Sequence, residues 1–159
     1  MSRVFAIADL HLSHENMAKY RGFNSVLEHD NLIIENWNKT ISKRDVVYIL
    51  GDVTMETKKP YHILNKLNGI KKVVGGNHDL PQHVPELLKY VHSFCAMFKY
   101  KGFILTHCPV HESEINRFRK NIHGHVHGLS LPDSRYVNVS CEAVNYTPIL
   151  ISSINNKDE

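Results

Sequence analysis

Three histidines occupy alternate positions in the segment NIHGHVHG, which spans residues 121–128. They are His123, His125 and His127, with glycine before His125 and after His127. Imidazole is the commonest metal ligand in proteins, and glycine beside paired imidazoles lets the backbone approach a ligand closely. The segment is therefore a candidate metal-binding site, although a His-x-His pair in a strand can also be one solvated face.

Four further polar clusters follow apolar segments of the chain. They are ADLHLSH with Asp9 and His11, LGD with Asp52, GGNHD with Asn77, His78 and Asp79, and LTHCP with His107. Each alone has a simpler explanation, since Gly-Asp is often a turn and GNHD can join two strands. Together they offer oxygen and imidazole ligands without thiolate. This donor set suits Mn, Fe, Zn, Ni or Co rather than calcium or a cysteine-rich zinc site, and it exceeds what one tetrahedral ion needs.

Apolar segments predict the elements that must position these clusters. Strands are expected at residues 3–8, 45–50, 70–75, 91–100, 101–107, 121–128 and 135–140, and helices at 29–41, 58–69 and 81–90. Alternating strands and helices predict an α/β layer, and the consecutive strands near the end predict antiparallel pairing, with a hairpin turn at Lys101–Gly102. The polar clusters would then lie at strand ends, where α/β sheets place their sites.

Composition indicates an ordinary globular protein. The 159 residues, 42% hydrophobic and 22% charged, fit one domain over residues 1–159. The net charge of +3 permits an anionic substrate but is too small to indicate a dedicated nucleic-acid surface. Twelve histidines are the unusual feature.

The cysteines and the apolar segments predict a cytoplasmic protein. Cys95, Cys108 and Cys141 are odd in number and lack CxxC spacing, which fits a reducing compartment. We interpret Cys108 as a small packing residue. No signal peptide and no stretch long enough to span a membrane is evident, so no membrane partner is expected.

The order of the clusters resembles the calcineurin-like metallophosphoesterases. The motifs DLH, GD, GNHD, HCP and GHVH run in that family's order from Asp9 to His127. The flanking segments look like the small single-domain phosphoesterases of bacteria and phages. The resemblance implies a four-layer α/β/β/α sandwich with two mixed β-sheets and a site built from the loops at their edge.

The resemblance also implies a role for each matching residue. The ligands of a first metal would be Asp9, His11 and His127, those of a second Asn77, His107 and His125, and Asp52 would bridge the two. His78 matches the family's catalytic histidine, and Asp79 would orient it. His14 and Arg21 follow the first motif and are candidate substrate contacts. We expect His123 to support the ligands or to pack, because the family does not require histidine there.

The implied activity is hydrolysis of a phosphate ester. Two divalent ions lower the pKa of a shared water, and the resulting hydroxide attacks phosphorus. Mn²⁺ is favoured as the metal, with Ni²⁺, Co²⁺, Fe²⁺ and Zn²⁺ as alternatives.

The short chain narrows the substrate class. It leaves no room for a cap domain, and an open site favours a phosphodiester, of nucleotide type or a cyclic nucleotide. A phosphomonoesterase or protein phosphatase of the same superfamily is the alternative. A non-catalytic interaction scaffold is a remote third, because every position implied as a metal ligand is intact.

Overall fold

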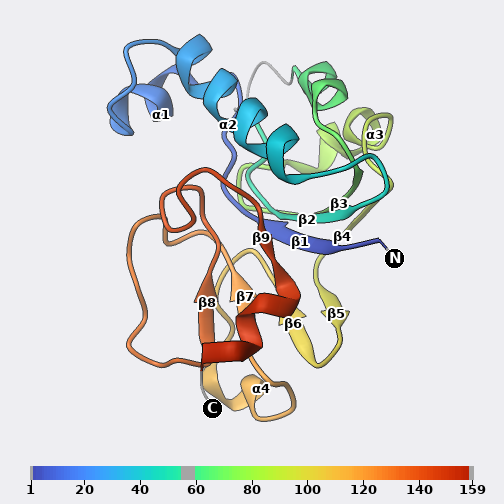
Figure 1. The fold of residues 1–159 in the computed structure, drawn as a ribbon, viewed down its shortest axis with the longest axis vertical. Coiled ribbons are helices and arrows are strands. Elements are labelled where there is room, and N and C mark those ends of the chain that lie inside the picture. The colour runs from blue at the N-terminus through green and yellow to red at the C-terminus, as the bar shows by residue number, and fades with distance from the viewer. Residues whose placement is uncertain (1, 55–59, 158–159) are drawn as a thin grey trace.

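A computed structural model describes residues 2–54 and 60–157, which contain two β-sheets and several short helices (Figure 1). The first sheet has the strand order β4-β3-β2-β1-β9. Its strands are β1 (Val4–Ile7), β2 (Val46–Leu50), β3 (Ile70–Val74), β4 (Ser93–Cys95) and β9 (Ile149–Leu150). Strands β1 to β4 are parallel and β9 is antiparallel to β1. Parallel strands covered on both faces explain the apolar segments of the sequence.

The second sheet has the order β5-β6-β7-β8 and is also mixed. Its strands are β5 (Phe98–Tyr100), β6 (Phe103–Leu105), β7 (Asn121–His123) and β8 (Tyr136–Asn138). The predicted hairpin is present between β5 and β6, and both turn residues, Lys101 and Gly102, have positive φ. The expectation of antiparallel pairing throughout is wrong, because β6, β7 and β8 are parallel to one another. The connections between them are long enough for the crossovers that parallel pairing needs.

The helices lie mainly beside the first sheet. They are α1 (Glu15–Tyr20), α2 (Val26–Thr40), η1 (Tyr61–Lys66), η2 (Pro81–His83), α3 (Val84–Leu87), α4 (Glu112–Ile115) and η3 (Ile151–Lys157). Ser25 caps α2 by accepting a hydrogen bond from the Glu28 backbone N–H. The helix expected at 58–69 is instead the 3₁₀-helix η1, and residues 58 and 59 lie outside the described part of the chain. Within residues 2–54 and 60–157, no helix has the length and apolar character needed to cross a membrane.

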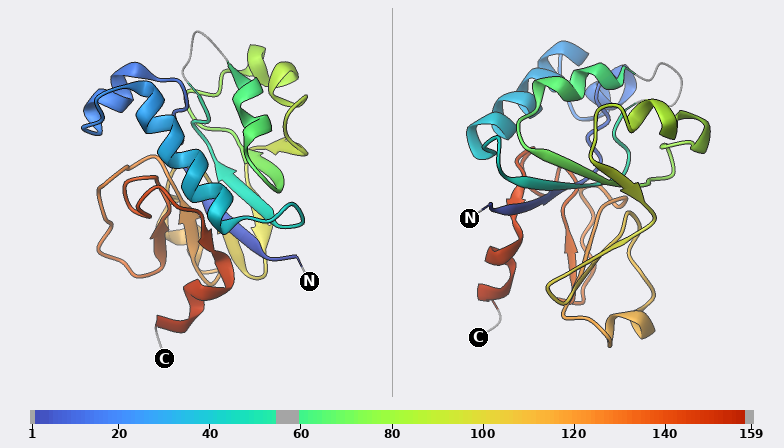
Figure 2. Two further views of the ribbon diagram at one scale, coloured as in Figure 1. Left: turned by 45° about the horizontal axis from the view of Figure 1, so that its top comes forward. Right: turned by 90° about the vertical axis from the view of Figure 1, so that its right-hand side faces the viewer.

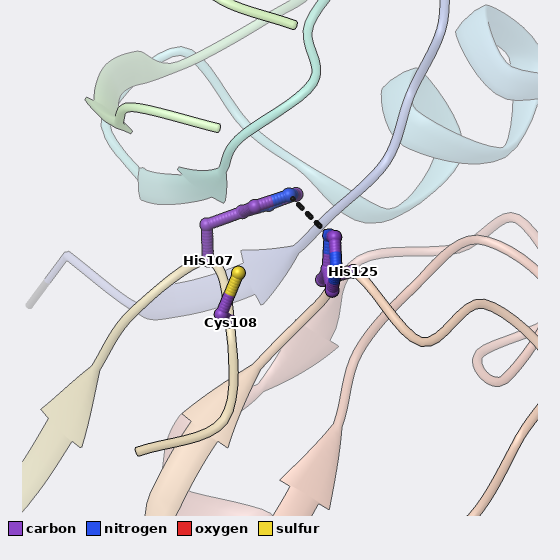
Figure 3. Close-up of side chains that lie close together, drawn as sticks. All are labelled: His107, Cys108 and His125. Atoms are coloured by element: carbon purple, nitrogen blue, oxygen red, sulfur yellow. Dashed lines mark hydrogen bonds between the residues drawn. The ribbon is translucent and has the colours of Figure 1, made fainter. Parts of the chain in front are cut away.

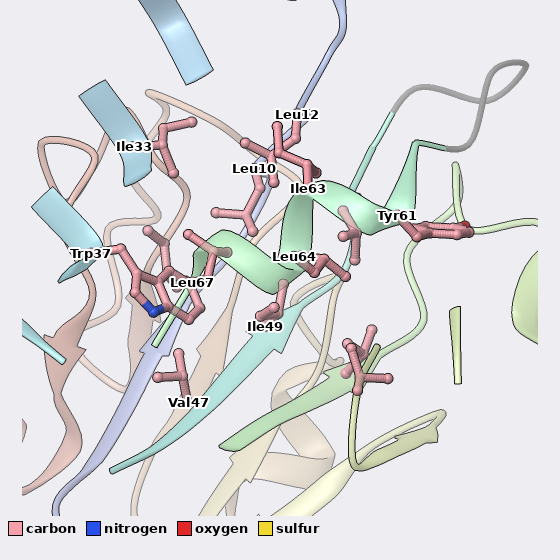
Figure 4. Close-up of a cluster of buried hydrophobic side chains, with 14 of the residues drawn as sticks. Leu10, Leu12, Ile33, Trp37, Val47, Ile49, Tyr61, Ile63, Leu64 and Leu67 are labelled. Atoms are coloured by element: carbon pink, nitrogen blue, oxygen red, sulfur yellow. The ribbon is translucent and has the colours of Figure 1, made fainter. Parts of the chain in front are cut away.

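One apolar core lies between the first sheet and the helices (Figure 4). Ile33 and Trp37 of α2 pack with Leu64 of η1 against Val47 and Ile49 of β2, and all five are buried. The Trp37 indole N–H donates to the Asn68 carbonyl at 2.8 Å. The apolar stripe of the 29–41 segment therefore belongs to the core.

A second apolar core joins the two sheets. Ala6, Tyr48 and Leu50 of the first sheet pack against Phe103 and Ile122 of the second. Figure 2 shows the first sheet between the helices on one side and the second sheet on the other. The protein is thus α/β with two stacked mixed sheets.

The two sheets bring several strand ends together. The backbone N–H of Ala8 donates to the Val139 carbonyl, and the N–H of Gly124 donates to the His107 carbonyl. The strand predicted at 121–128 ends at His123, because His125 and His127 have φ of 72° and 51° and so leave the extended conformation. The last two histidines of the motif are therefore loop residues.

Candidate metal centre

Asp9 follows β1 and presents one free carboxylate oxygen. Its Oδ2 accepts hydrogen bonds from the backbone N–H of His125 and the hydroxyl of Ser140, both at 2.8 Å. Its Oδ1 is buried and has no hydrogen-bond partner among the described residues. A buried carboxylate oxygen without a partner is costly unless a cation is bound there.

His11 lies 4.0 Å from that oxygen, measured from its Nε2 to Asp9 Oδ1. Both of its ring nitrogens are buried and lack a hydrogen-bond partner within the described part of the chain. Burial, with a further contribution from the Arg21 cation, lowers the pKa of His11 to about 2. The imidazole is therefore neutral and offers the lone pair that a metal requires.

His127 stacks on His11 with ring centroids 5.5 Å apart, and its ligand atom groups with those of Asp9 and His11. Its Nδ1 lies 3.0 Å from Glu142 Oε1. A carboxylate only accepts, so Nδ1–H donates to it, and in the neutral ring Nε2 keeps its lone pair. This carboxylate–histidine arrangement is the usual support of a metal-binding imidazole.

Arg21 also supports His127, through its ion pair with Glu142. Its side chain is fully buried, and its Nε donates to Glu142 Oε1 at 2.8 Å. The guanidinium also donates to the backbone carbonyl of Asp9 at 2.7 Å. Burial raises the pKa of Glu142, but the hydrogen bonds with His127 and Arg21 outweigh it and lower the pKa to about 2. Arg21 therefore holds the first ligand group in place and does not line an open cleft.

Asn77, His107 and His125 form a second group of converging atoms. His107 Nε2 is 2.8 Å from Asn77 Oδ1, His125 Nδ1 is 3.0 Å from the same oxygen, and the two ring nitrogens are 3.2 Å apart. Figure 3 shows a ring nitrogen of each imidazole pointing toward the other. Ligands at right angles on an ion with bonds of ~2.1 Å are separated by ~3.0 Å, so the three atoms fit one face of a coordination sphere.

The hydrogen bond on the other side of His107 fixes its tautomer. Nδ1 lies 2.7 Å from the Leu50 carbonyl, which only accepts, so Nδ1 carries the proton. In neutral His107, Nε2 and Asn77 Oδ1 are then two acceptors in contact. A bound cation relieves that repulsion, which makes this cluster a good fit for a metal.

Cys108 lies beside this group, and its thiol is exposed (Figure 3). Its sulfur lies in one potential ligand cluster with His107 and His125. The interpretation of Cys108 as a packing residue is therefore wrong, because its side chain points out of the core toward the ligands.

Asp52 lies between the two groups. Its Oδ1 accepts from the His78 backbone N–H at 2.9 Å. Its Oδ2 is 3.5 Å from His107 Nε2 and 3.7 Å from His11 Nε2. Burial raises the pKa of Asp52, against the opposing effect of His107. A carboxylate that faces one histidine of each group has the position of a bridging ligand.

Three glycines allow the ligands to approach so closely. A Cβ on Gly76 would overlap the carboxylate of Asp52, and one on Gly124 would overlap Asp9. Gly51 has φ of +88°, and a Cβ there would overlap the His107 ring. The backbone at these glycines therefore lies directly against the side chains of the site, at a distance that no Cβ would permit.

Backbone strain is concentrated at the same residues. Among the described residues, nine that are not glycine have positive φ. Five of them are predicted ligands: Asp9, His11, Asp52, His125 and His127. Such conformations cost of order 1–3 kcal/mol each and persist where surrounding contacts impose them, often at functional sites.

His78 and Asp79 follow Asn77, a predicted ligand, but face different surroundings. The His78 side chain is 34% exposed, with Nε2 4.0 Å from Asp52 Oδ2. Asp79 is buried, and its carboxylate accepts from the backbone N–H of Asp52, Val53 and Gly76 at 2.7, 3.1 and 2.9 Å. Asp79 thus holds the loop that carries Asp52, the predicted bridging residue.

His14 and His123 lie next to the ligands. His14 Nδ1 accepts from the Met17 N–H at 3.3 Å and so caps α1, with its ring 5.7 Å from that of His11. His123 is buried, its Nδ1–H donates to the Gly124 carbonyl at 2.9 Å, and its ring meets Tyr136 edge-on. His123 therefore packs behind the ligand loop, as expected.

Sequence reasoning missed Glu142, Ser140 and Asn138. Asn138 donates to the His127 carbonyl at 2.6 Å and accepts from the Ser140 N–H at 2.9 Å. The signal was the segment VNVSCE, in which Asn138 ends β8 and the polar residues Ser140 and Glu142 follow it, much as the other clusters follow their strands.

One curated relative aligns over nearly the whole chain. The uncharacterized protein MJ1445 of Methanocaldococcus jannaschii is 33% identical in an alignment of 168 positions that covers 97% of this chain and 90% of that protein. No model of a known protein family matches the chain.

Two solved structures share the fold. A protein of unknown function from Aquifex aeolicus, AQ665, superposes with a TM-score of 0.76 at 24% identity and covers 98% of both chains. The nuclease MPE of Pseudomonas putida superposes with a TM-score of 0.56 at 18% identity, over 79% of this chain and 62% of the nuclease. At these identities the likeness concerns the fold.

Proposed function

We propose that this chain, which belongs to the same protein family as MJ1445, is a phosphodiesterase that depends on two divalent metal ions. The observation that carries the proposal is the pair of ligand groups around Asp52, one with buried atoms that lack partners and one with acceptors in contact. The nuclease with the similar fold supports phosphate-ester chemistry. The motif order supports the calcineurin-like superfamily and its four-layer architecture.

The proposed ligands divide between two ions. Asp9, His11 and His127 would hold the first, Asn77, His107 and His125 the second, and Asp52 would be shared. When bound, such ions polarise the phosphate and activate water at neutral pH. Mn²⁺ suits these oxygen and nitrogen donors. Cys108 would add a softer donor if Zn²⁺ were bound at the second group.

The chain's own groups would complete the chemistry. His78 is the partly exposed imidazole beside Asp52, so it can donate a hydrogen bond to a phosphate oxygen or a proton to the departing alkoxide. Asp79 keeps Asp52 and the His78 loop in register through backbone hydrogen bonds. Asn77 is a neutral ligand, which avoids adding negative charge where the phosphate binds.

A diester is favoured over a monoester because the ligand loops are open. His125 is exposed, and no cap covers it within residues 2–54 and 60–157. The phosphomonoesterase alternative uses the same ligands and differs in how the extra phosphate charge is balanced. The scaffold alternative is disfavoured, since unpartnered buried groups such as Asp9 Oδ1 would destabilise a protein that bound no ion.

The test is hydrolysis by protein that has been stripped with chelator and reloaded with Mn²⁺. We expect turnover of bis-p-nitrophenyl phosphate, loss of that turnover in Asp52→Asn, and slower turnover of p-nitrophenyl phosphate. Turnover of the monoester alone would change the proposal to a phosphatase. Inactivity toward both esters with Mn²⁺, Ni²⁺, Co²⁺ and Zn²⁺ would contradict catalysis.

A further inference from the structure

A cavity of about 450 Å³ lies directly beside the ligand loop. Its walls are formed by Tyr20, His125, Val126, His127, Gly128 and Leu129. One proposed ligand of each metal therefore borders it. The volume falls within the range of small-molecule sites, roughly 300–1,000 Å³.

Two of the cavity's walls are unusually exposed apolar side chains. Tyr20 is 78% exposed and Leu129 is 73% exposed, the two highest values for large apolar residues in the described part of the chain. A single exposed apolar side chain is common in soluble proteins. Two in one cavity next to the proposed ligands indicate a surface that binds an apolar group.

The backbones that carry these side chains are fixed. Tyr20 ends α1, and the next residue, Arg21, is anchored by its N–H to the Met17 carbonyl and by its buried side chain. The Leu129 N–H donates to the Val126 carbonyl, and its own carbonyl accepts from Asn138 at 2.9 Å. The backbone at both positions is therefore held in place before any ligand binds, so binding needs to order only the two side chains.

We propose that this cavity is a nucleoside subsite, in which the base of a nucleotide phosphate stacks on Tyr20 and contacts Leu129. The inference rests on the proposed function, because the ions on His125 and His127 would fix the phosphate at the edge of the cavity. Every nucleobase, whichever of the four it is, has an aromatic face that can stack on a tyrosine ring. The substrate class is then a nucleotide diester, whose base binds this cavity by stacking.

The test compares two ligands that differ only by the base. Calorimetry on the Mn²⁺-loaded protein measures Kd for thymidine 5′-monophosphate and for 2-deoxyribose 5-phosphate. We expect the nucleotide to bind at least about tenfold tighter, the scale of base–aromatic stacking. Tyr20→Ala should remove this preference and leave Kd for the sugar phosphate unchanged, whereas Tyr20→Phe should keep it.

Leu27→Ala is the matched control, since Leu27 is also an exposed apolar residue, on α2 rather than at the cavity. It should leave both Kd values unchanged. Equal binding of the two ligands by the wild type would overturn the subsite and leave the phosphoesterase proposal standing. A tenfold preference without ester hydrolysis would support the subsite and refute the enzyme. Failure of both ligands to bind would also overturn the subsite, and the hydrolysis assay would then decide the phosphoesterase proposal separately.

Discussion

At the scale of single residues, the main finding is how completely His127 is supported. Glu142 accepts from its Nδ1, Arg21 donates to Glu142, and the same guanidinium reaches the Asp9 carbonyl. Two ligands of the proposed first metal therefore depend on one buried ion pair. Breaking such a pair leaves an uncompensated charge, so its members are sensitive to substitution.

Glu142→Gln is predicted to weaken binding of Mn²⁺ at the first group. The glutamine can still accept from Nδ1, but without its charge the imidazole becomes a poorer donor to the metal. Loss of a supporting carboxylate of this kind typically reduces metal affinity by about 10- to 100-fold. Calorimetric titration of the metal-free protein measures the change.

The control is Glu86→Gln in α3, which removes a glutamate whose side chain is 45% exposed and pairs with Lys89 rather than with a proposed ligand. It should bind Mn²⁺ as the wild type does. Equal affinity in Glu142→Gln and the control, with circular dichroism unchanged, would show that Glu142 does not support the metal.

His11 makes the metal-free protein sensitive to acid. Its pKa is about 6.5 when unfolded and about 2 when folded, so below pH 6.5 the unfolded chain binds a proton that the folded chain excludes. Stability from this group is therefore lost as pH falls, by up to ~1.4 kcal/mol per pH unit. Urea denaturation between pH 7.5 and 5.5 should show a smaller loss for His11→Gln than for the wild type. A substitution of the exposed His92 should not change the loss, and parallel curves for all three proteins would refute the assignment.

At the scale of elements, the sequence identified most of what builds the site. The apolar segments at 3–8 and 45–50 correspond to β1 and β2, because strands buried on both faces require mainly apolar residues. The segment at 70–75 corresponds to β3, which is buried at Val73 and Val74 but carries the partly buried Lys71 and Lys72. The helix at 29–41 corresponds to α2 for a similar reason, since its apolar stripe faces the core. The polar clusters after these strands do converge.

The elements that sequence missed depend on contacts between distant residues. Alternation in NIHGHVHG suggested a strand to residue 128, but the loop after His123 is imposed by Asp9, which accepts from the His125 N–H. Parallel pairing of β6, β7 and β8 is likewise a property of the fold and not of any local pattern. Glu142 was missed because its partner, Arg21, is far away in the chain.

Gly51→Ala is predicted to destabilise the protein more than Gly22→Ala. Both glycines have strongly positive φ, but a Cβ on Gly22 meets nothing within 4 Å, whereas one on Gly51 overlaps His107 and Gly76. The conformational penalty of roughly 1–2 kcal/mol is common to both. Overlap should add about 1–3 kcal/mol at Gly51, measured by urea denaturation of metal-free protein. Equal losses would mean that close approach to His107 is not required.

At the scale of the whole molecule, the site joins the two sheets. Asp9, Asp52 and Asn77 follow strands of the first sheet, and His107 and His125 follow strands of the second. Ions held by these residues would connect the two sheets at the edge where the apolar core between the sheets ends.

Metal loading is therefore predicted to raise the thermal midpoint. At a free ion concentration 100 times Kd, binding contributes about 2.7 kcal/mol, or about 5–10 °C for a chain of this size. Scanning calorimetry with Mn²⁺ and with chelator measures the shift, which Asp52→Asn should reduce. The same midpoint under both conditions would contradict a metal that binds the folded state.

The most direct test of the central claim is anomalous diffraction from crystals grown with Mn²⁺. Two peaks ~3.5–4 Å apart are predicted. One peak should lie against Asp9, His11 and His127 and the other against Asn77, His107 and His125, with the Asp52 carboxylate contacting both. A single peak, or peaks away from Asp52, would contradict the binuclear centre.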